Sequence, residues 1–153
     1  MASLIQTQLE ANALLRQHGL AEKGWTFKWD TAKRRGGACH YRTKDISMSK
    51  YLVAMWPESE VTETLLHEVA HALAGSAAGH GRAWQIIARS IGSTGARTHS
   101  NEVVQGRYVA ICDHCGVEAH RAHRMSPAMK QGRHLHAKCR KPVRWVDTGT
   151  LVR

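Results

Sequence analysis

The residues best suited to chemistry lie in an H-E-x-x-H motif formed by His67, Glu68 and His71. Side chains four residues apart on a helix lie on the same face, so His67 and His71 can offer two imidazole nitrogens to one metal ion. In a zinc peptidase, the glutamate of this motif is not a ligand. It hydrogen-bonds the metal-bound water and takes its proton. The spacing therefore predicts a helix that carries two zinc ligands and a general base.

Apolar side chains surround the motif over residues 65–73. A chance match on a solvent-facing helix would more often be flanked by charged residues. A buried position also suits zinc, because a low dielectric strengthens its hold on anionic species. The alternative, in which both histidines are ordinary core or surface residues, is therefore the weaker interpretation.

A third zinc ligand is expected at His80, nine residues after His71 and between Gly79 and Gly81. Glycines on both sides allow the backbone to turn tightly and to bring the imidazole back over the metal. Three protein ligands and a water form the open coordination of catalytic zinc. An ordinary polar loop residue is the alternative at this position.

A second group of metal-binding residue types lies in the last third of the chain. It consists of a C-x-x-C pair, Cys112 and Cys115, and an H-x-x-C pair, His136 and Cys139, with twenty residues between the pairs. This spacing predicts a closed, tetrahedral structural zinc site. His134 competes with His136 as the fourth ligand. A cluster of unligated thiols is less plausible, since so small a segment with few large apolar side chains would barely be stable without metal.

Positive charge is concentrated in the same segment. Residues 1–102 carry 12 Lys and Arg against 9 Asp and Glu, a net charge of +3, whereas residues 103–153 carry 10 against 3, a net charge of +7. Such a charge suits a polyanionic partner, nucleic acid first. The residues expected to contact nucleic acid are Arg121, Arg124, Lys130, Arg133, Arg140, Lys141 and Trp145. A solvated basic surface with Trp145 packed inward is the alternative.

Periodicity predicts the elements that position these residues. Helices are expected over residues 3–18, 57–74 and 82–91, and strands over residues 25–30, 38–42, 45–49 and 108–112. We expect two domains, residues 1–102 and 103–153. No apolar run approaches the roughly 18 residues that span a bilayer, and the N-terminus lacks a signal-peptide pattern, so an intracellular, cytoplasmic protein with no membrane partner is expected.

The motifs together resemble the SprT-like (Spartan-type) zinc metalloprotease family, in which H-E-x-x-H is followed by G-H-G and an aromatic residue, here Trp84. The stretch from Gly37 to Ile46-Ser47-Met48-Ser49 is similar to the family's glycine-led strand and edge strand. The resemblance implies an α+β fold: a zincin-like metalloprotease core, with helices packed on a small antiparallel sheet, and a small C-terminal zinc ribbon. His136 departs from the family pattern, because the second pair of such ribbons is usually C-x-x-C.

The resemblance also implies a function. It indicates a zinc-dependent endopeptidase with one catalytic and one structural Zn²⁺, in which Glu68 activates a zinc-bound water. The implied substrates are DNA-associated or DNA-crosslinked proteins, and the implied location is the nucleoid for a cellular protein or the host cytoplasm for a viral one. Two alternatives stay open: a non-catalytic nucleic-acid-binding zinc protein that uses the protease-like domain as a scaffold, and a structural or regulatory partner protein that uses both zinc ions for folding.

Overall fold

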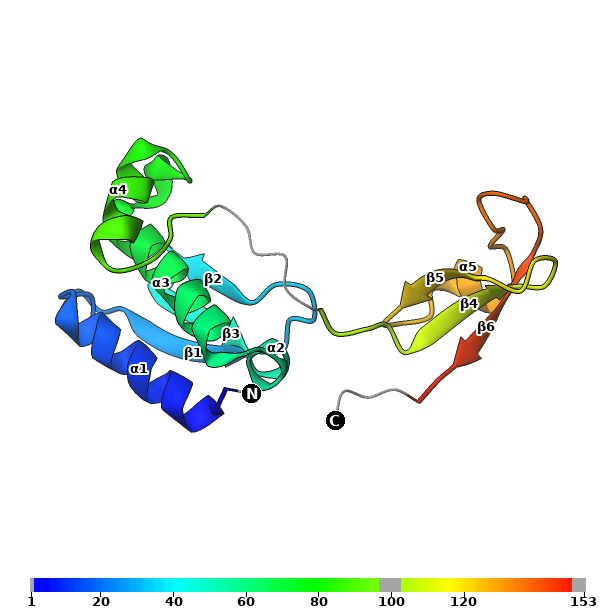
Figure 1. The fold of residues 1–153 in the computed structure, drawn as a ribbon, viewed down its shortest axis with the longest axis horizontal. Coiled ribbons are helices and arrows are strands. Elements are labelled where there is room, and N and C mark those ends of the chain that lie inside the picture. Colours follow the sequence, from blue (N-terminus) through cyan, green and yellow to red (C-terminus); the bar gives the residue numbers. More distant parts are fainter. Residues whose placement is uncertain (1, 97–102, 150–153) are drawn as a thin grey trace. The chain divides into compact units, whose positions relative to one another are not determined.

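The chain forms two compact units, Met1–Val103 and Val104–Arg153 (Figure 1). The computed structural model describes residues 2–96 and 103–149. The division lies one residue beyond the expected domain boundary after Glu102, which itself falls outside the described residues.

The first unit combines helices with a small three-stranded sheet. Its elements in chain order are α1 (Leu4–Gln17), β1 (Thr26–Asp30), β2 (Gly37–His40), β3 (Asp45–Ser49), α2 (Lys50–Met55), α3 (Glu58–Ala74), a single 3₁₀ turn (Ser76–Ala78) and α4 (Arg82–Ser90). The three long helices and three strands match the expected segments closely. The α+β class expected for this part of the chain is therefore confirmed.

The sheet of this unit is mixed. Its strand order is β1-β3-β2, and β3 pairs antiparallel with β2 but parallel with β1. The expected antiparallel sheet is thus wrong for one of the two pairings. The segment 31–44, which contains β2, crosses from one edge of the sheet to the other before the chain returns to the centre, and such a crossover makes β1 and β3 run in the same direction.

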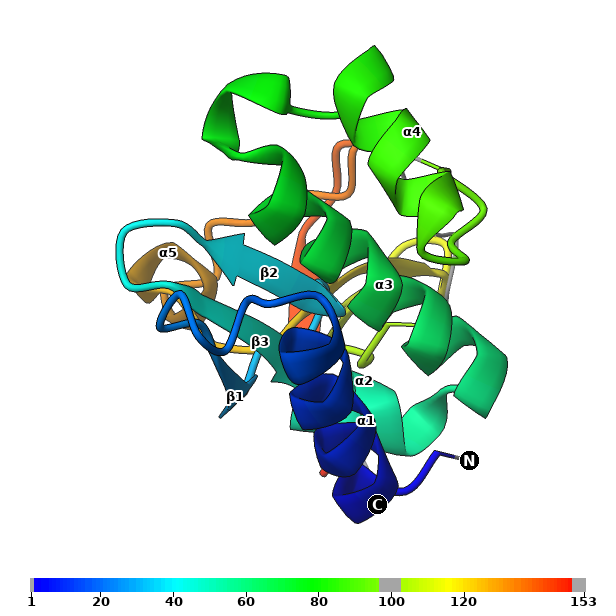
Figure 2. The ribbon, with the colours of Figure 1, turned by 90° about the vertical axis from the view of Figure 1, so that its left-hand side faces the viewer.

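The central strand β3 has an apolar face and a polar face, although all five of its residues are buried. Helices α1 and α3 cover one face of the sheet (Figure 2). Ile46 and Met48 share this face, because Gly37, the partner of Met48, has its Cβ side toward Glu68 of α3. On the opposite face, the Ser47 hydroxyl donates to the Asp30 carboxylate at 2.7 Å. Residues of β1 and β2 that pair with Ile46 or Met48 share the helix-covered face, because side chains alternate along strands.

Local signals set both ends of α3. Pro57 occupies the N-cap position, and Glu58 and Glu60 lie in the first turn, where carboxylates interact favourably with the helix dipole. Gly75 ends the helix with a φ of 83°, a conformation that favours glycine. Gly79 repeats this conformation after the 3₁₀ turn, with a φ of 50°. These glycines let the chain reverse and begin α4 beside α3.

The short helix α2 is not among the helices predicted from the sequence. Its N-cap is Ser49, whose hydroxyl accepts a hydrogen bond from the Leu52 backbone N–H at 3.2 Å and donates to the Ala32 carbonyl at 2.5 Å. A serine that ends a strand and immediately caps a helix leaves no polar connector between them, which explains why the sequence pattern did not predict α2.

The second unit is an antiparallel sheet with a long connection. It contains β4 (Tyr108–Cys112), β5 (Glu118–Ala122), a short α5 (Pro127–Lys130) and β6 (Val143–Asp147), in the strand order β5-β4-β6. Of these elements only β4 was predicted. Among the described residues, no helix is both long enough and apolar enough to cross a membrane.

Candidate metal centres

Three histidine side chains converge at the end of α3. One helical turn separates His67 from His71, and the turn after Gly75 returns His80 to the same place. The three Nε2 atoms lie 3.2 Å (His67 to His71), 3.0 Å (His71 to His80) and 3.0 Å (His80 to His67) apart. The structure thus brings together all three residues predicted from the sequence.

This geometry fits a zinc ion. Zn–N bonds of about 2.0–2.1 Å in a tetrahedral site require ligand nitrogens about 3.3 Å apart, close to the distances found here. Burial, and then the proximity of His80, lower the pKa of His71 and favour the neutral imidazole that binds metal. Three mutually facing Nε2 atoms cannot all be satisfied by hydrogen bonds with one another, since each imidazole Nε2 carries at most one proton. A cation at their centre satisfies all three.

Trp84 of α4 packs against all three imidazoles. Its ring centroid lies 4.7 Å from that of His67, 5.2 Å from that of His71 in a stacked arrangement, and 4.8 Å from that of His80. Trp84 is fully buried with Ala70 and Ala88. The indole therefore forms an apolar wall that restricts the orientation of each ring, a role of the kind that tunes metal affinity from outside the ligand set.

Glu68 is buried beside the histidines, with only 9% of its surface exposed. Burial raises the pKa of its carboxyl from 4.5 to about 7, against the opposing effect of the Arg35 guanidinium. A carboxyl with this pKa is suited to both accepting and releasing a proton near neutral pH. Its side chain lies against the backbone of β2 at Gly37, a contact that the motif did not predict. The Gly36-Gly37 pair at the start of a strand was the available signal.

The second cluster lies in the second unit and is formed by Cys112, Cys115, His136 and Cys139, as predicted from their spacing. Cys112 Sγ lies 3.3 Å from Cys139 Sγ, and His136 Nδ1 lies 3.0 Å from Cys139 Sγ and 3.4 Å from Cys115 Sγ. All four cysteines of the chain are free thiols. This set matches a closed Cys₃His zinc site.

Two observations support metal binding by this second cluster. The backbone N–H of Cys115 hydrogen-bonds the Cys112 sulfur and, as the largest cause, lowers the pKa of Cys112 to about 6, which favours the thiolate that binds zinc. The competing residue His134 instead packs its ring against Trp145, at a centroid distance of 5.7 Å. The structure therefore selects His136 over His134 as the histidine of the cluster.

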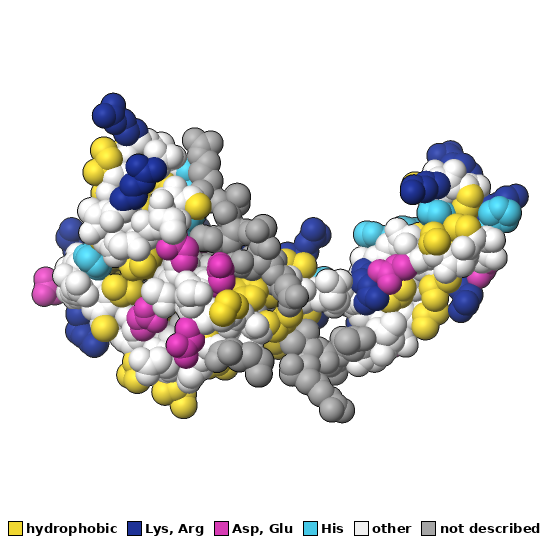
Figure 3. Space-filling model, viewed as in Figure 1, with side chains coloured by type: hydrophobic (Ala, Val, Ile, Leu, Met, Phe, Trp, Pro, Cys, Tyr) yellow, Lys and Arg dark blue, Asp and Glu magenta, His cyan; other side chains and the backbone are white. Residues whose placement is uncertain are grey.

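The basic residues of the second unit fall into two groups. Those on or beside the strands form ion pairs: Arg107 with Asp147, Arg121 with Glu118, and Arg144 with Asp113. Together these three acids are all the Asp and Glu of residues 103–153. The other group lies between β5 and β6, is exposed, and has no acidic partner among the described residues: Arg124, Lys130, Arg133, Lys138, Arg140 and Lys141. Figure 3 shows Lys and Arg side chains gathered at the loop end of this unit.

Trp145 is half-buried and belongs to the interior of the second unit. It packs against the buried cluster of Ala110, Cys112 and Val143. The ring of His120 also meets it edge to face, at a centroid distance of 6.1 Å. This packing follows the inward orientation that was the alternative to nucleic-acid contact. Base stacking on Trp145 stays a prediction.

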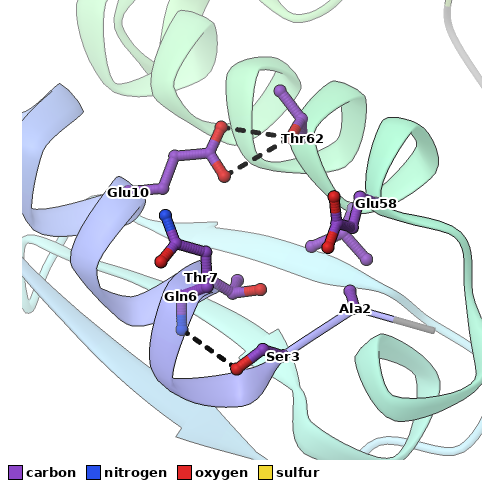
Figure 4. A pocket seen from close by; sticks show the side chains of 8 residues that line it. Ala2, Ser3, Gln6, Thr7, Glu10, Glu58 and Thr62 are labelled. Carbon is purple, nitrogen blue, oxygen red and sulfur yellow. Dashed lines mark hydrogen bonds between the residues drawn. The ribbon is translucent and has the colours of Figure 1, made fainter.

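A polar hollow of about 280 Å³ lies between α1 and the start of α3 (Figure 4). Within it, the Thr62 hydroxyl donates to the Glu10 carboxylate at 3.1 Å, and the Ser3 hydroxyl caps α1 by accepting from the Gln6 N–H at 3.3 Å. None of the histidines or cysteines of the two clusters lines this hollow. Its polar groups serve helix capping and helix packing, so the candidate chemistry lies elsewhere.

Comparison with known proteins gives a match to one family model. A family model described as the SprT-like family matches residues 5–105. The match spans α1 to α4 and includes the three histidines and Glu68, and residues from 106 onward lie outside it. Comparisons with curated proteins and with solved structures found no match.

The two clusters predict the zinc content of variants. We expect about two zinc ions per chain in the wild type and about one in either His80→Ala or His136→Ala, because each change removes a ligand from a different site. His134→Ala is the control for His136→Ala and should keep two. Zinc would be measured by atomic emission on gel-filtered protein, and two retained ions in His80→Ala would contradict the three-histidine site.

Proposed function

Because the chain belongs to the SprT-like family, whose members are in general metalloprotease-like, we propose that it is a zinc-dependent endopeptidase with a zincin-like core. The observation that carries the proposal is the convergence of three histidine Nε2 atoms, 3.0–3.2 Å apart, beside a buried glutamate on α3. An open three-histidine site next to a carboxylate of raised pKa suits hydrolysis better than a purely structural metal, which normally has four protein ligands.

Each residue of the site has a distinct role in this proposal. His67, His71 and His80 would hold zinc, with Trp84 behind their rings. Zinc in such a site polarises a carbonyl and lowers the pKa of water from about 15.7 to about 7. Glu68 is the general base that orients the attacking water and removes its proton.

The proton balance requires Glu68 twice. The glutamate first accepts a proton as water adds to the peptide carbonyl carbon, and it then gives that proton to the nitrogen as the C–N bond breaks. Burial raises the pKa of this carboxyl, and a raised pKa favours both accepting and releasing a proton near neutral pH. The products are a carboxylic acid and an amine, which become a carboxylate and an ammonium group when the remaining proton passes to the amine.

The second unit would bring the enzyme to nucleic acid. Six exposed cations lie between residues 124 and 141, a segment without Asp or Glu, on a unit that the Cys₃His cluster would stabilise. Lys and Arg without acidic neighbours can neutralise phosphates and release counterions. DNA-associated or DNA-crosslinked proteins are therefore the proposed substrates. The same observation favours one second candidate, a non-catalytic nucleic-acid-binding zinc protein with the first unit as a scaffold.

The proposed role of Glu68 predicts the effect of Glu68→Gln. General-base catalysis contributes roughly 10²–10⁴-fold, so the variant should lose at least about 100-fold in kcat for cleavage of a DNA-bound basic protein. Because glutamine has nearly the same shape, its zinc content and melting temperature should match those of the wild type. Cleavage would be followed by gel electrophoresis with and without DNA.

Glu60→Gln supplies the control for this experiment, since it neutralises an acid in the first turn of the same helix, away from the histidines. Its rate should stay within about twofold of the wild type. Equal cleavage by the wild type and Glu68→Gln would contradict the proposed base. If both are inert while both bind DNA, the scaffold candidate is favoured.

The two groups of cations predict different effects on nucleic-acid binding. Changing Lys130, Arg133 and Lys141 to Gln should weaken duplex binding about 10-fold or more and reduce the slope of log K against log salt by up to about 2.7. A control variant with Arg107, Arg121 and Arg144 changed to Gln loses the same charge but removes only paired arginines. It should weaken binding much less, and equal losses in both variants would contradict the assignment.

A further inference from the structure

One strand of the sheet has no side chain at the position that faces the proposed general base. Trp29, Met48 and Gly37 lie in one row across β1, β3 and β2, because Met48 pairs with both of the others. This row faces α1 and α3: the Trp29 indole N–H donates to the side-chain amide oxygen Oε1 of Gln8 on α1 at 2.9 Å. Glycine is therefore the one residue of the row that contributes no side chain to the layer between sheet and helices.

Glu68 fills the place left by that missing side chain. A Cβ atom added at Gly37 would lie 2.8 Å from Glu68 Cγ, 3.1 Å from Glu68 Oε1 and 3.2 Å from Thr64 Cγ2. A contact below 3.0 Å forces one of the two groups to move. The backbone of β2 thus lies directly on the side chain of Glu68, with no room for even a methyl group.

Two neighbouring groups on this side of β2, Cys39 and Tyr41, are neutral at neutral pH. The Cys39 thiol and the Tyr41 hydroxyl hydrogen-bond one another. Burial raises the pKa of each to about 12, followed by the Glu68 charge for Cys39 and by the neighbouring Cys39 for Tyr41. Neither group therefore places a negative charge beside Glu68 at neutral pH. The Arg35 guanidinium, which pairs with Asp30 at 2.8 Å, also acts on the Glu68 charge. The close approach of β2 to the Glu68 side chain is at Gly37.

We propose that Gly37 is a positioning residue for Glu68: the absence of a side chain at this point of β2 fixes where the carboxylate lies relative to the three histidines. The inference rests on the proposed role of Glu68 as general base. It goes beyond that role, because it assigns the placement of the base to the sheet and not to the helix that carries it. A methyl group at position 37 would displace the carboxylate while leaving the zinc ligands in place.

The test uses Gly37→Ala in the zinc-loaded 153-residue chain. We expect kcat for protein cleavage to fall at least 10-fold, with KM within about twofold and zinc content unchanged at two per chain. A wild-type kcat would overturn the proposal. So would loss of zinc from the three-histidine site, since that would mean that the histidines, and not Glu68, depend on Gly37.

Gly36→Ala is the matched control. A Cβ at Gly36 would lie 2.4 Å and 2.5 Å from atoms of the Trp56 ring and 3.3 Å from Thr64 Cγ2, so its severe contacts are with Trp56 and not with Glu68. This variant should lower the melting temperature at least as much as Gly37→Ala does, yet keep kcat within about threefold of the wild type when assayed well below its melting temperature. An equal loss of kcat in both variants would show a general effect of β2 and overturn the proposal.

A double-mutant cycle with Glu68→Ala tests the contact between Gly37 and Glu68 without an activity assay. Removing Cγ and the carboxylate makes room for a methyl group at position 37, so the drop in melting temperature caused by Gly37→Ala should shrink by at least half in the Glu68→Ala background. Gly36→Ala should cause the same drop in both backgrounds. If Gly37→Ala alone does not fold, Gly37→Ala/Glu68→Ala should, and its failure to do so would overturn the proposal.

Protein cleavage and melting temperature together distinguish failure of the proposed peptidase activity from failure of the proposed role of Gly37. Coupling in the cycle together with an inert wild type would remove the proposed peptidase activity but retain the packing of Glu68 on Gly37. An active wild type without coupling would remove the positioning role and leave the peptidase proposal standing.

Discussion

The first unit depends on how one polar stretch of α3 is buried. His67 and Glu68 are both less than 10% exposed, and burial of such groups is unfavourable unless neighbouring residues accommodate them. Three neighbours do so. The return of His80 completes a set of nitrogens that suits a cation, Trp84 packs behind the three rings, and Gly37 leaves space for the carboxylate. The sheet, through Gly37, and α4, through Trp84, thus both pack against the same turn of α3.

The second unit follows a different physical rule. Its buried side chains are few, and its sheet is small, so a metal ion held by the four converging side chains would add substantially to its stability. Its three acids neutralise arginines on or beside the strands, which leaves the connection between β5 and β6 with unopposed positive charge. The sheet of this unit therefore holds the buried side chains and the ion pairs, whereas the connection between β5 and β6 carries the excess positive charge.

The sequence predicted those features that depend on local spacing. Three patterns predicted candidate ligands: histidines four apart on a helix, a histidine between two glycines, and paired C-x-x-C and H-x-x-C motifs. The structure brings these candidate ligands together in two clusters. The mixed sheet, the helix α2, and the contacts of Gly37 and Trp84 were not predicted. Each of these depends on which distant segments lie side by side, and periodicity along the chain contains no information on strand order or on the close approach of a strand to a helix.

A crystal structure of the zinc-loaded protein, with anomalous diffraction recorded at the zinc edge, tests the central claim most directly. The account predicts two zinc peaks. One should lie between Nε2 of His67, His71 and His80 with a non-protein fourth ligand, and the other among the sulfurs of Cys112, Cys115 and Cys139 and Nδ1 of His136. A missing peak at the three histidines, or a fourth protein side chain that closes that site, would contradict it.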